Sequence, residues 1–257
     1  MKKLYKYLLN TLPRPLLIRL SYVFRVFAPL VYKGNKVDCP VCEKSFKKFL
    51  SYGSSVAHRD NVLCPYDLTL ERHRLMWIYL KDKSNFFTEE KLRVMHIAPE
   101  QCFYSRFKKQ NNIEYTTGDL LSPLADIHFD LHKIPLEDNQ YDVIFCNHVL
   151  EHVENDHKCM TELHRIMNSG GWGIFQVPID TSRSETYEDA SITSPAEREK
   201  HFWQYDHVRL YGLDYRKKLE AAGFEVEVYD YHKDMPKEQY EKYRFHADEL
   251  LYIVKKK

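Results

Sequence analysis

Three features are missing from the chain, and their absence narrows its class. The N-terminal apolar run is broken by Arg14, Arg19 and Arg25 and is followed by no small-residue cleavage site, so neither a signal peptide nor a spanning helix is expected. Six cysteines in 257 residues exclude a disulfide-rich scaffold and favour a reduced, cytoplasmic setting. Internal repeats and low-complexity tracts are also missing, and the composition, 44% hydrophobic and 29% charged, is that of a globular protein.

A formal net charge of only +1 conceals an uneven distribution. Residues 1–50 carry eleven Lys or Arg against two acidic residues, a net +9, which leaves −8 for the remainder. Such a segment is typical of contact with something anionic, so peripheral contact of residues 1–32 with the inner membrane surface and contact with nucleic acid both stay open beside a plain solvated face.

The apolar run of residues 16–32 predicts a short amphipathic helix. Packing of this helix on its own protein is favoured over interfacial attachment, because its rings supply more aromatic area than a weak anchor needs. The aromatic residues of this segment are Tyr5, Tyr22, Phe24, Phe27 and Tyr32.

The chain divides into a basic segment 1–33, a cysteine-bearing module 34–68 and a main domain 69–257. From residue 91 onward strands alternate with helices, which predicts parallel βαβ units in a doubly wound α/β fold. The expected strands are LRVMHIA, IEYTTGD, YDVIFCN, GWGIFQVPI, FEVEVYDY and ELLYIVK.

Two helices and one long connection frame these strands. A helical pattern runs from Leu68 to about Leu80, and a second covers residues 157–168, with Asp156 as N-cap and Gly170 as terminator. The polar segment 181–206 has the length of a lid or substrate wall.

Polar residues follow the expected strands at the edge where doubly wound sheets bind ligands. The first strand ends in His96-Ile97-Ala98-Pro99-Glu100, the second in Asp119, the next short segment in Asp130, and the fourth strand in Asn147-His148. An adenosyl cofactor needs a carboxylate for its ribose, a close backbone approach near its amino-acid end and a polar group at adenine. Asp119, the turn of residues 96–100 and Asp130 supply these three features, respectively.

The segments DLHKIPLEDNQYDVIFCNHVLEHV, LHRIMNSGGWGIFQVP and HVRLYGLDYRKKLEAAGFEVEV resemble the methyltransferase type 11 group of class I, S-adenosylmethionine-dependent enzymes. The resemblance spans roughly residues 91–232. It implies a Rossmann-like sheet of seven mostly parallel strands with an antiparallel last strand. It also implies which residues bind the cofactor. The turn would contribute His96, Ala98, Pro99 and Glu100. Asp119, with Leu120 beside it, would hold the ribose, Asp130 and Leu131 would meet adenine, and Asn147 and His148 would lie beside the methionine part.

The chain departs from this family at the first turn. His96 stands where an acidic residue is usual, and Ala98 and Glu100 occupy glycine positions at which a missing Cβ lets backbone meet cofactor. The HIAPE form resembles a subgroup that also carries a cysteine module in front. The same turn lacks the Gly-x-Gly-x-x-Gly that a nicotinamide-dependent oxidoreductase would need.

The module carries Cys39-Pro-Val-Cys42 and, 21 residues later, Cys64-Pro-Tyr-Asp67, which resembles a zinc ribbon whose fourth cysteine is Asp67. A structural zinc held by Cys39, Cys42, Cys64 and Asp67 is favoured. His58 as fourth ligand, and Asp67 as a mere helix cap at a metal-free site, stay open.

Three histidines, His148, His152 and His207, are candidate general bases for a hydroxyl or amine acceptor, although methyl transfer by alignment alone needs none. Candidate substrate-binding residues are Arg183, Arg209 and Tyr211. The favoured function is methyl transfer to a small-molecule or glycan- or lipid-linked substrate. The alternatives are a nucleic-acid methyltransferase of the rRNA type and a catalytically silent S-adenosylmethionine-binding protein. The sequence leaves the oligomeric state open.

Overall fold

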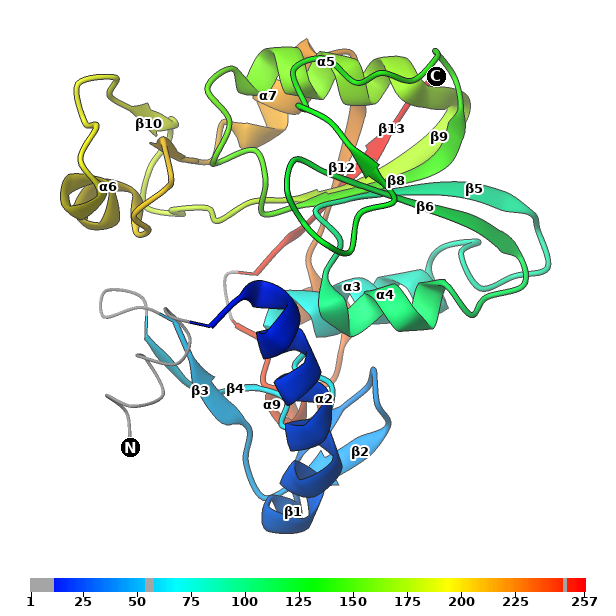
Figure 1. The fold of residues 1–257 in the computed structure, drawn as a ribbon, viewed down its shortest axis with the longest axis vertical. Helices are drawn as coiled ribbons and strands as arrows, with labels where there is room; N and C mark the ends of the chain where they lie inside the picture. The colour runs from blue at the N-terminus through cyan, green and yellow to red at the C-terminus, as the bar shows by residue number, and fades with distance from the viewer. Residues whose placement is uncertain (1–11, 54–57, 247–248) are drawn as a thin grey trace.

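The computed structural model describes residues 12–53, 58–246 and 249–257. A central sheet lies between two helical layers, and a small β-rich module adjoins the lower layer (Figure 1). The seven strands of the sheet are β5 (Leu92–Ile97), β6 (Ile113–Asp119), β7 (Ile127–His128), β8 (Tyr141–Asn147), β9 (Met167–Gln176), β12 (Glu225–Tyr229) and β13 (Leu251–Lys255).

The strands are ordered β12-β13-β9-β8-β5-β6-β7. All neighbours from β9 to β7 pair in parallel, whereas β13 is antiparallel to both β9 and β12. The chain runs outward from β5 to β7 and then returns to β8 on the other side, so the strand order switches between β5 and β8. The predicted doubly wound sheet with an antiparallel last strand is confirmed.

The two faces of the sheet have separate apolar cores, because successive strand residues point to opposite sides. Val94 and Val143 belong to the core shared with α3 (Glu71–Asp82) and α4 (Gln101–Phe107). Their neighbours Met95 and Ile144 belong to the core shared with α5 (Asp156–Ile166) and α7 (Tyr215–Ala221).

Two antiparallel pairs build the module, β1 (Lys33–Cys39) with β2 (Lys44–Phe46), and β3 (Leu50–Tyr52) with β4 (Arg59–Leu63). Its buried residues Phe46 and Phe49 form one core with the α3 side of the sheet. The buried guanidinium of Arg74 donates to the carbonyls of Val62 and Thr69 at 2.9 Å and of Tyr243 at 2.8 Å. Module and sheet are therefore packed as one body, next to α8 (Tyr231–Asp234) and α9 (Lys237–Lys242).

The predicted N-terminal helix is α2 (Arg14–Val31), but its orientation differs from the expectation of packing. Ser21, Arg25 and the buried Ala28 face the protein, whereas Phe24 and Phe27 are exposed, so the prediction that these two rings are buried is wrong. Tyr32 packs on the core as expected. Tyr5 and the side chain of Tyr22 lie outside the described residues. None of the described helices is both long and apolar enough to cross a bilayer.

Two further predictions need correction. Asn155, not Asp156, caps α5, since its side chain accepts the Lys158 N–H at 2.9 Å while Asp156 is the first helical residue. The helix ends at Ile166, because Met167 already pairs with Tyr141 as the start of β9.

The expected lid of residues 181–206 contains regular structure. It holds β10 (Tyr187–Glu188), which pairs with β11 (Arg209–Leu210), and α6 (Pro195–Phe202). Figure 1 shows this segment projecting beyond one edge of the sheet.

Candidate active site and metal centre

The register of the sheet places the residues that follow β5, β6 and β8 side by side. Ile97 of β5 lies opposite Gly118 of β6 and Cys146 of β8, so the residues that follow, Ala98, Asp119 and Asn147, share one edge. The carboxyl ends of β5, β6 and β8 thus bring together residues up to fifty positions apart at the switch in strand order.

The turn after β5 has a left-handed residue at one of the positions where the family resemblance implies glycine. Ala98 has φ +49°, in the left-handed region that favours glycine, and its N–H donates to the Gly118 carbonyl at 2.8 Å. A non-glycine residue in this conformation costs about 1–2 kcal/mol. This turn therefore adopts a conformation that favours glycine, at a conformational cost for Ala98.

The side chains of His96 and Glu100 support this turn through hydrogen bonds on its buried side. The fully buried His96 contacts the Tyr115 hydroxyl at 2.8 Å and Glu100 Oε2 at 2.6 Å, and His73 Nε2 lies 3.5 Å from Glu100 Oε1. Burial opposes ionisation of Glu100, but hydrogen bonds from His73 and His96 outweigh it and keep its pKa well below the usual value. Pro99 is also buried, so these side chains shape the turn, and cofactor contact at His96, Pro99 and Glu100 stays a prediction.

Asp119 and Asp130 stand where ribose and adenine ligands are expected. Oδ1 of Asp119 accepts the N–H groups of Leu121 and Ser122 at 2.7 and 2.6 Å. Leu120 is exposed beside it. Asp130 is exposed and accepts the His132 N–H, and this hydrogen bond lowers its pKa. Leu131 is buried in the core. Both carboxylates are thus fixed by hydrogen bonds within their own loops.

The end of β8 carries a buried asparagine, Asn147, followed by a histidine with a left-handed backbone conformation, His148. Asn147 is buried, where its oxygen accepts the Gln176 N–H at 3.3 Å. His148 has φ +55°, and its Nε2 is a buried atom without a hydrogen-bond partner. Burial, and then the charge of Arg72, lower the pKa of His148, so its ring is neutral and able to accept a proton near pH 7.

The three candidate histidines surround a buried carboxylate. Glu151 is 1% exposed, and His148 Nδ1 lies 3.1 Å from its Oε1 without hydrogen-bond geometry. The rings of His152 and His207 meet edge to face at 4.7 Å, and one ligand atom each of Glu151, His152 and His207 lies within 4.8 Å of the others. The structure therefore brings the three predicted bases to one place.

The candidate substrate-binding residues differ in accessibility. Arg209 is buried and donates to the carbonyls of Leu150, Val153 and Glu154, and the buried Tyr211 hydroxyl donates to Leu150 O at 3.2 Å. Both residues fix the loop after β8. Arg183 is on the surface, paired with Asp180 at 3.0 Å. A role in substrate binding stays a prediction for all three.

Sequence reasoning missed the start of α3 as part of the site. His73 contacts Glu100, and the charge of Arg72 acts on both His73 and His148. The Nε of Arg72 is a buried atom without a hydrogen-bond partner. The available signal was the run Glu71-Arg72-His73-Arg74, because cations are disfavoured at a helix N-terminus unless something anionic compensates.

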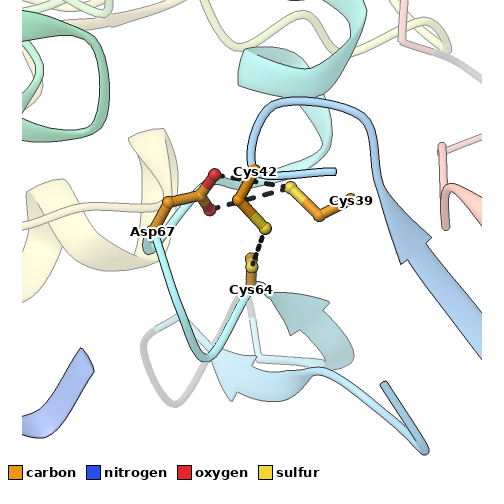
Figure 2. Close-up of side chains that lie close together, drawn as sticks. All are labelled: Cys39, Cys42, Cys64 and Asp67. Carbon is orange, nitrogen blue, oxygen red and sulfur yellow. Dashed lines mark hydrogen bonds between the residues drawn. The ribbon is translucent and has the colours of Figure 1, made fainter. Parts of the chain in front are cut away.

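The cysteine module places its four predicted ligands together (Figure 2). Its two knuckles have the same backbone, since Glu43 N donates to Cys39 O at 2.9 Å with φ +57° and Leu68 N donates to Cys64 O at 3.0 Å with φ +63°. Asp67 thus occupies the position that matches Cys42. His58 is elsewhere, paired with Asp60 at 3.3 Å, so it is not the fourth member.

Asp67 is buried beside thiols and does not cap α3. Its Oδ1 accepts the N–H and hydroxyl of Thr69, and the N–H of Leu70 goes to His73 Nδ1 instead. Burial, and then the charge of Cys39, raise the pKa of Asp67 to about 6. Burial opposes ionisation of Cys39, but the hydrogen bonds of Cys42 and Cys64 hold its pKa well below the usual value.

A cavity of about 490 Å³ lies beside the cysteine module, and its lining includes Pro40 but none of the clustered ligand residues. Residues of α3, β12, α8 and α9 line it, among them Asp82, Tyr229 and Gln239.

Comparison with known proteins gives one family match and several similar solved structures. Residues 79–175 match the sequence model of a family described as a methyltransferase domain. No curated protein matches the chain. Similar solved structures include a putative methyltransferase from Bacillus halodurans, with 16% identity over 73% of this chain and 99% of that one (TM-score 0.44). A putative S-adenosylmethionine-dependent methyltransferase from Listeria monocytogenes has 19% identity over 70% and 96% (TM-score 0.44). A third, from Archaeoglobus fulgidus, has 16% over 72% and 94% (TM-score 0.46).

The matched segment runs from the end of α3 through β9, and it includes the carboxyl ends of β5, β6 and β8. The cysteine module and the segment that carries His207 lie outside it. Residues 79–175 therefore match the methyltransferase domain family, and the resemblance inferred from the sequence motifs is confirmed over this segment.

Proposed function

We propose that the protein transfers the methyl group of S-adenosylmethionine to an acceptor placed beside the end of β8. The observation that carries this proposal is the register that aligns Ala98, Asp119 and Asn147 at the strand switch within the matched methyltransferase segment. The left-handed turn at Ala98 fits a cofactor that approaches the backbone closely.

The cofactor would lie along this edge, and its sulfonium would supply the activated methyl group. Asp119 would accept the ribose hydroxyls, since its Oδ2 takes no part in the loop hydrogen bonds described above. Asp130 and Leu131 would meet adenine. Arg72 would pair with the methionine carboxylate through its unpartnered Nε.

The acceptor side has the character of an acid–base site. His148 and His207 both have a pKa lowered first by burial, so each is neutral and can take a proton from a hydroxyl acceptor. A basic amine acceptor would need alignment with the methyl group alone.

The substitution Asp119→Ala tests the cofactor assignment. Loss of a charge-assisted hydrogen bond of about 1.5–3 kcal/mol should weaken binding roughly tenfold to a hundredfold in calorimetry. Asp138→Ala removes an exposed carboxylate that pairs with Arg165 and serves as the control. Unchanged affinity in Asp119→Ala would remove this residue from the site.

We also propose that the cysteine module holds a structural zinc ion. Zn–S bonds of about 2.3 Å in a tetrahedron place two sulfurs about 3.8 Å apart, and a carboxylate oxygen would lie about 3.5 Å from a sulfur. The Cys42 and Cys64 sulfurs are 3.8 Å apart, and Cys39 Sγ lies 3.5 Å from Asp67 Oδ2. The donor set and its spacing therefore both fit the metal.

The outer face of α2 supports a third proposal, that the protein rests on an anionic membrane surface. Among the described side chains of α2, this exposed face is apolar with Arg19 as its charged member, and its apolar side chains are 41–76% exposed. They are Leu16, Leu20, Val23, Phe24, Val26, Phe27, Leu30 and Val31. An exposed apolar face of this size marks an interaction site.

Charge indicates which partner the face of α2 would take. Five lysines of the adjoining module are exposed, and residues 1–50 carry +9 whereas the remainder carries −8. The lysines are Lys33, Lys36, Lys44, Lys47 and Lys48. A basic segment with an apolar helix face is typical of binding to anionic lipid, and this favours a lipid-linked or other amphiphilic acceptor.

Co-sedimentation with vesicles of phosphatidylcholine and phosphatidylglycerol tests this surface. Leu30→Glu should weaken binding about tenfold or more, since burial of such a side chain contributes about 1.5–3 kcal/mol. Leu213→Glu alters an exposed leucine outside α2 and should have no effect. Salt-dependent binding to RNA, with none to vesicles, would favour the nucleic-acid alternative.

A further inference from the structure

We propose that Glu151, His152 and His207 form a second metal site, for a divalent transition ion such as Zn²⁺, at the acceptor end of β8. The three side chains offer two imidazole nitrogens and one carboxylate oxygen, all within 4.8 Å of one another. Two histidines and a glutamate are a ligand set that holds catalytic zinc while leaving a coordination position open.

The buried carboxylate of Glu151 needs a positive partner. It is 1% exposed, and neither of its oxygens accepts a hydrogen bond from the described residues. A buried charge without such bonds is costly, and metal coordination is one of the usual ways in which proteins compensate it. His148 Nδ1 approaches Oε1 at 3.1 Å without hydrogen-bond geometry, so it does not satisfy this oxygen.

Both histidines are oriented as metal-binding imidazoles usually are. His207 Nδ1 lies 2.8 Å from the Phe202 carbonyl, which can only accept, so this nitrogen carries the proton and Nε2 keeps its lone pair. His152 Nδ1 faces Asp206 Oδ2 at 3.4 Å, an arrangement that again leaves Nε2 free. A carbonyl or carboxylate behind each ligand is the pattern that fixes the tautomer at metal sites.

The backbone holds the three ligands in register before any ion binds. Val208 N donates to Glu151 O at 2.9 Å, which joins the segment of His207 to that of Glu151 and His152. The Arg209 guanidinium fixes the same loop through the carbonyls of Leu150 and Val153. His152 is the half-exposed member, so a small rotation of its ring can bring the ligand atoms to bonding distance.

An ion at this place would present its open position to an oxygen of the acceptor and lower the pKa of a bound hydroxyl. That role rests on the proposed function, whereas the metal site itself does not. The proposed acceptor class is then a hydroxyl compound rather than an amine.

Elemental analysis of the full chain, dialysed against Zn²⁺ without cofactor or acceptor, tests the site. Wild type should hold one more zinc per chain than Glu151→Gln or His207→Gln. The control His157→Gln, an exposed histidine on α5, should match wild type. The half-exposed His152→Gln gives a second test if the buried variants fail to fold.

Co²⁺ substitution separates the two clusters, because only the cysteine cluster can give a thiolate-to-cobalt absorption band. The variants should keep this band and lose the other equivalent of cobalt. Equal metal content in wild type and all variants would overturn the second site. Wild type that binds S-adenosylmethionine but no second metal would overturn this inference alone, and wild type that binds the metal but no cofactor would overturn the proposed function alone.

Discussion

The two clusters of metal-ligand residues differ in how far they are closed. Cys39, Cys64 and Asp67 are buried in the module, and the backbones of two matching knuckles fix them (Figure 2). The cluster of Glu151, His152 and His207 has only three members, joins the segment after β8 to the segment after α6, and has one half-exposed ligand. Closed four-ligand sites support folding, whereas three-ligand sites leave room for chemistry. A metal ion held by the first cluster would therefore stabilise the fold, and one held by the second would be open to an acceptor.

The largest effect should come from breaking the closed cluster. Cys42→Ser should lower the melting temperature by roughly 10 °C or more, because structural zinc binding contributes directly to folding and 1 kcal/mol corresponds to about 2–4 °C in a chain of this size. Since the module shares its core with α3, one transition should move as a whole in calorimetry. A melting temperature within 2 °C of wild type would show that the module is held by packing alone.

A substitution in the cluster of Glu151, His152 and His207 should lower the rate of methyl transfer and leave the stability of the fold nearly unchanged. Glu151→Gln is close to isosteric, so its melting temperature in the presence of a chelator should stay within about 3 °C of wild type. Methyl transfer to a hydroxyl acceptor should fall by about 10²-fold or more, the usual contribution of acid–base or metal assistance. Large destabilisation with unchanged turnover would reverse the roles of the two clusters.

Replacement of Asp67, the one non-cysteine member of the closed cluster, tests how this residue sets the affinity for zinc. Asp67→Cys restores four thiolates at a position whose backbone matches that of Cys42, and it should hold zinc more tightly in competition with a chelator. Asp67→Asn keeps the shape but removes the charge and should bind more weakly. The opposite order of affinities would show that the site is built around a carboxylate.

The smallest effect should be on how the melting temperature depends on pH, through His73 near the end of β8. Burial, and then the charge of Arg72, lower the pKa of His73 from 6.5 to about 4. The folded protein then binds fewer protons here than the unfolded chain, so His73 costs stability as the pH falls from about 6.5 to 4. His73→Gln should flatten this part of the profile of melting temperature against pH. A profile unchanged by the substitution would assign the acid sensitivity to other groups.

Much of the sheet was predictable because its strands are short apolar runs bounded by polar corners. β6 and β8 begin and end at the predicted residues, and the four cysteine-module ligands lie together as their spacing indicated. The end of α5 was not predictable from periodicity, since Met167 continues the helical pattern although cross-strand pairing with Tyr141 takes it into β9.

The sequence by itself determined which residues stand at the strand ends and that two knuckles of like spacing exist, because both follow from local patterns of apolar, turn and ligand residues. Only the tertiary structure decided which side of α2 faces outward, and that Arg72 and His73 reach the strand ends. It alone brought Glu151 and His152 to His207, more than fifty residues away. These outcomes depend on which surfaces pack together, and packing joins residues whose separation along the chain carries no signal of contact.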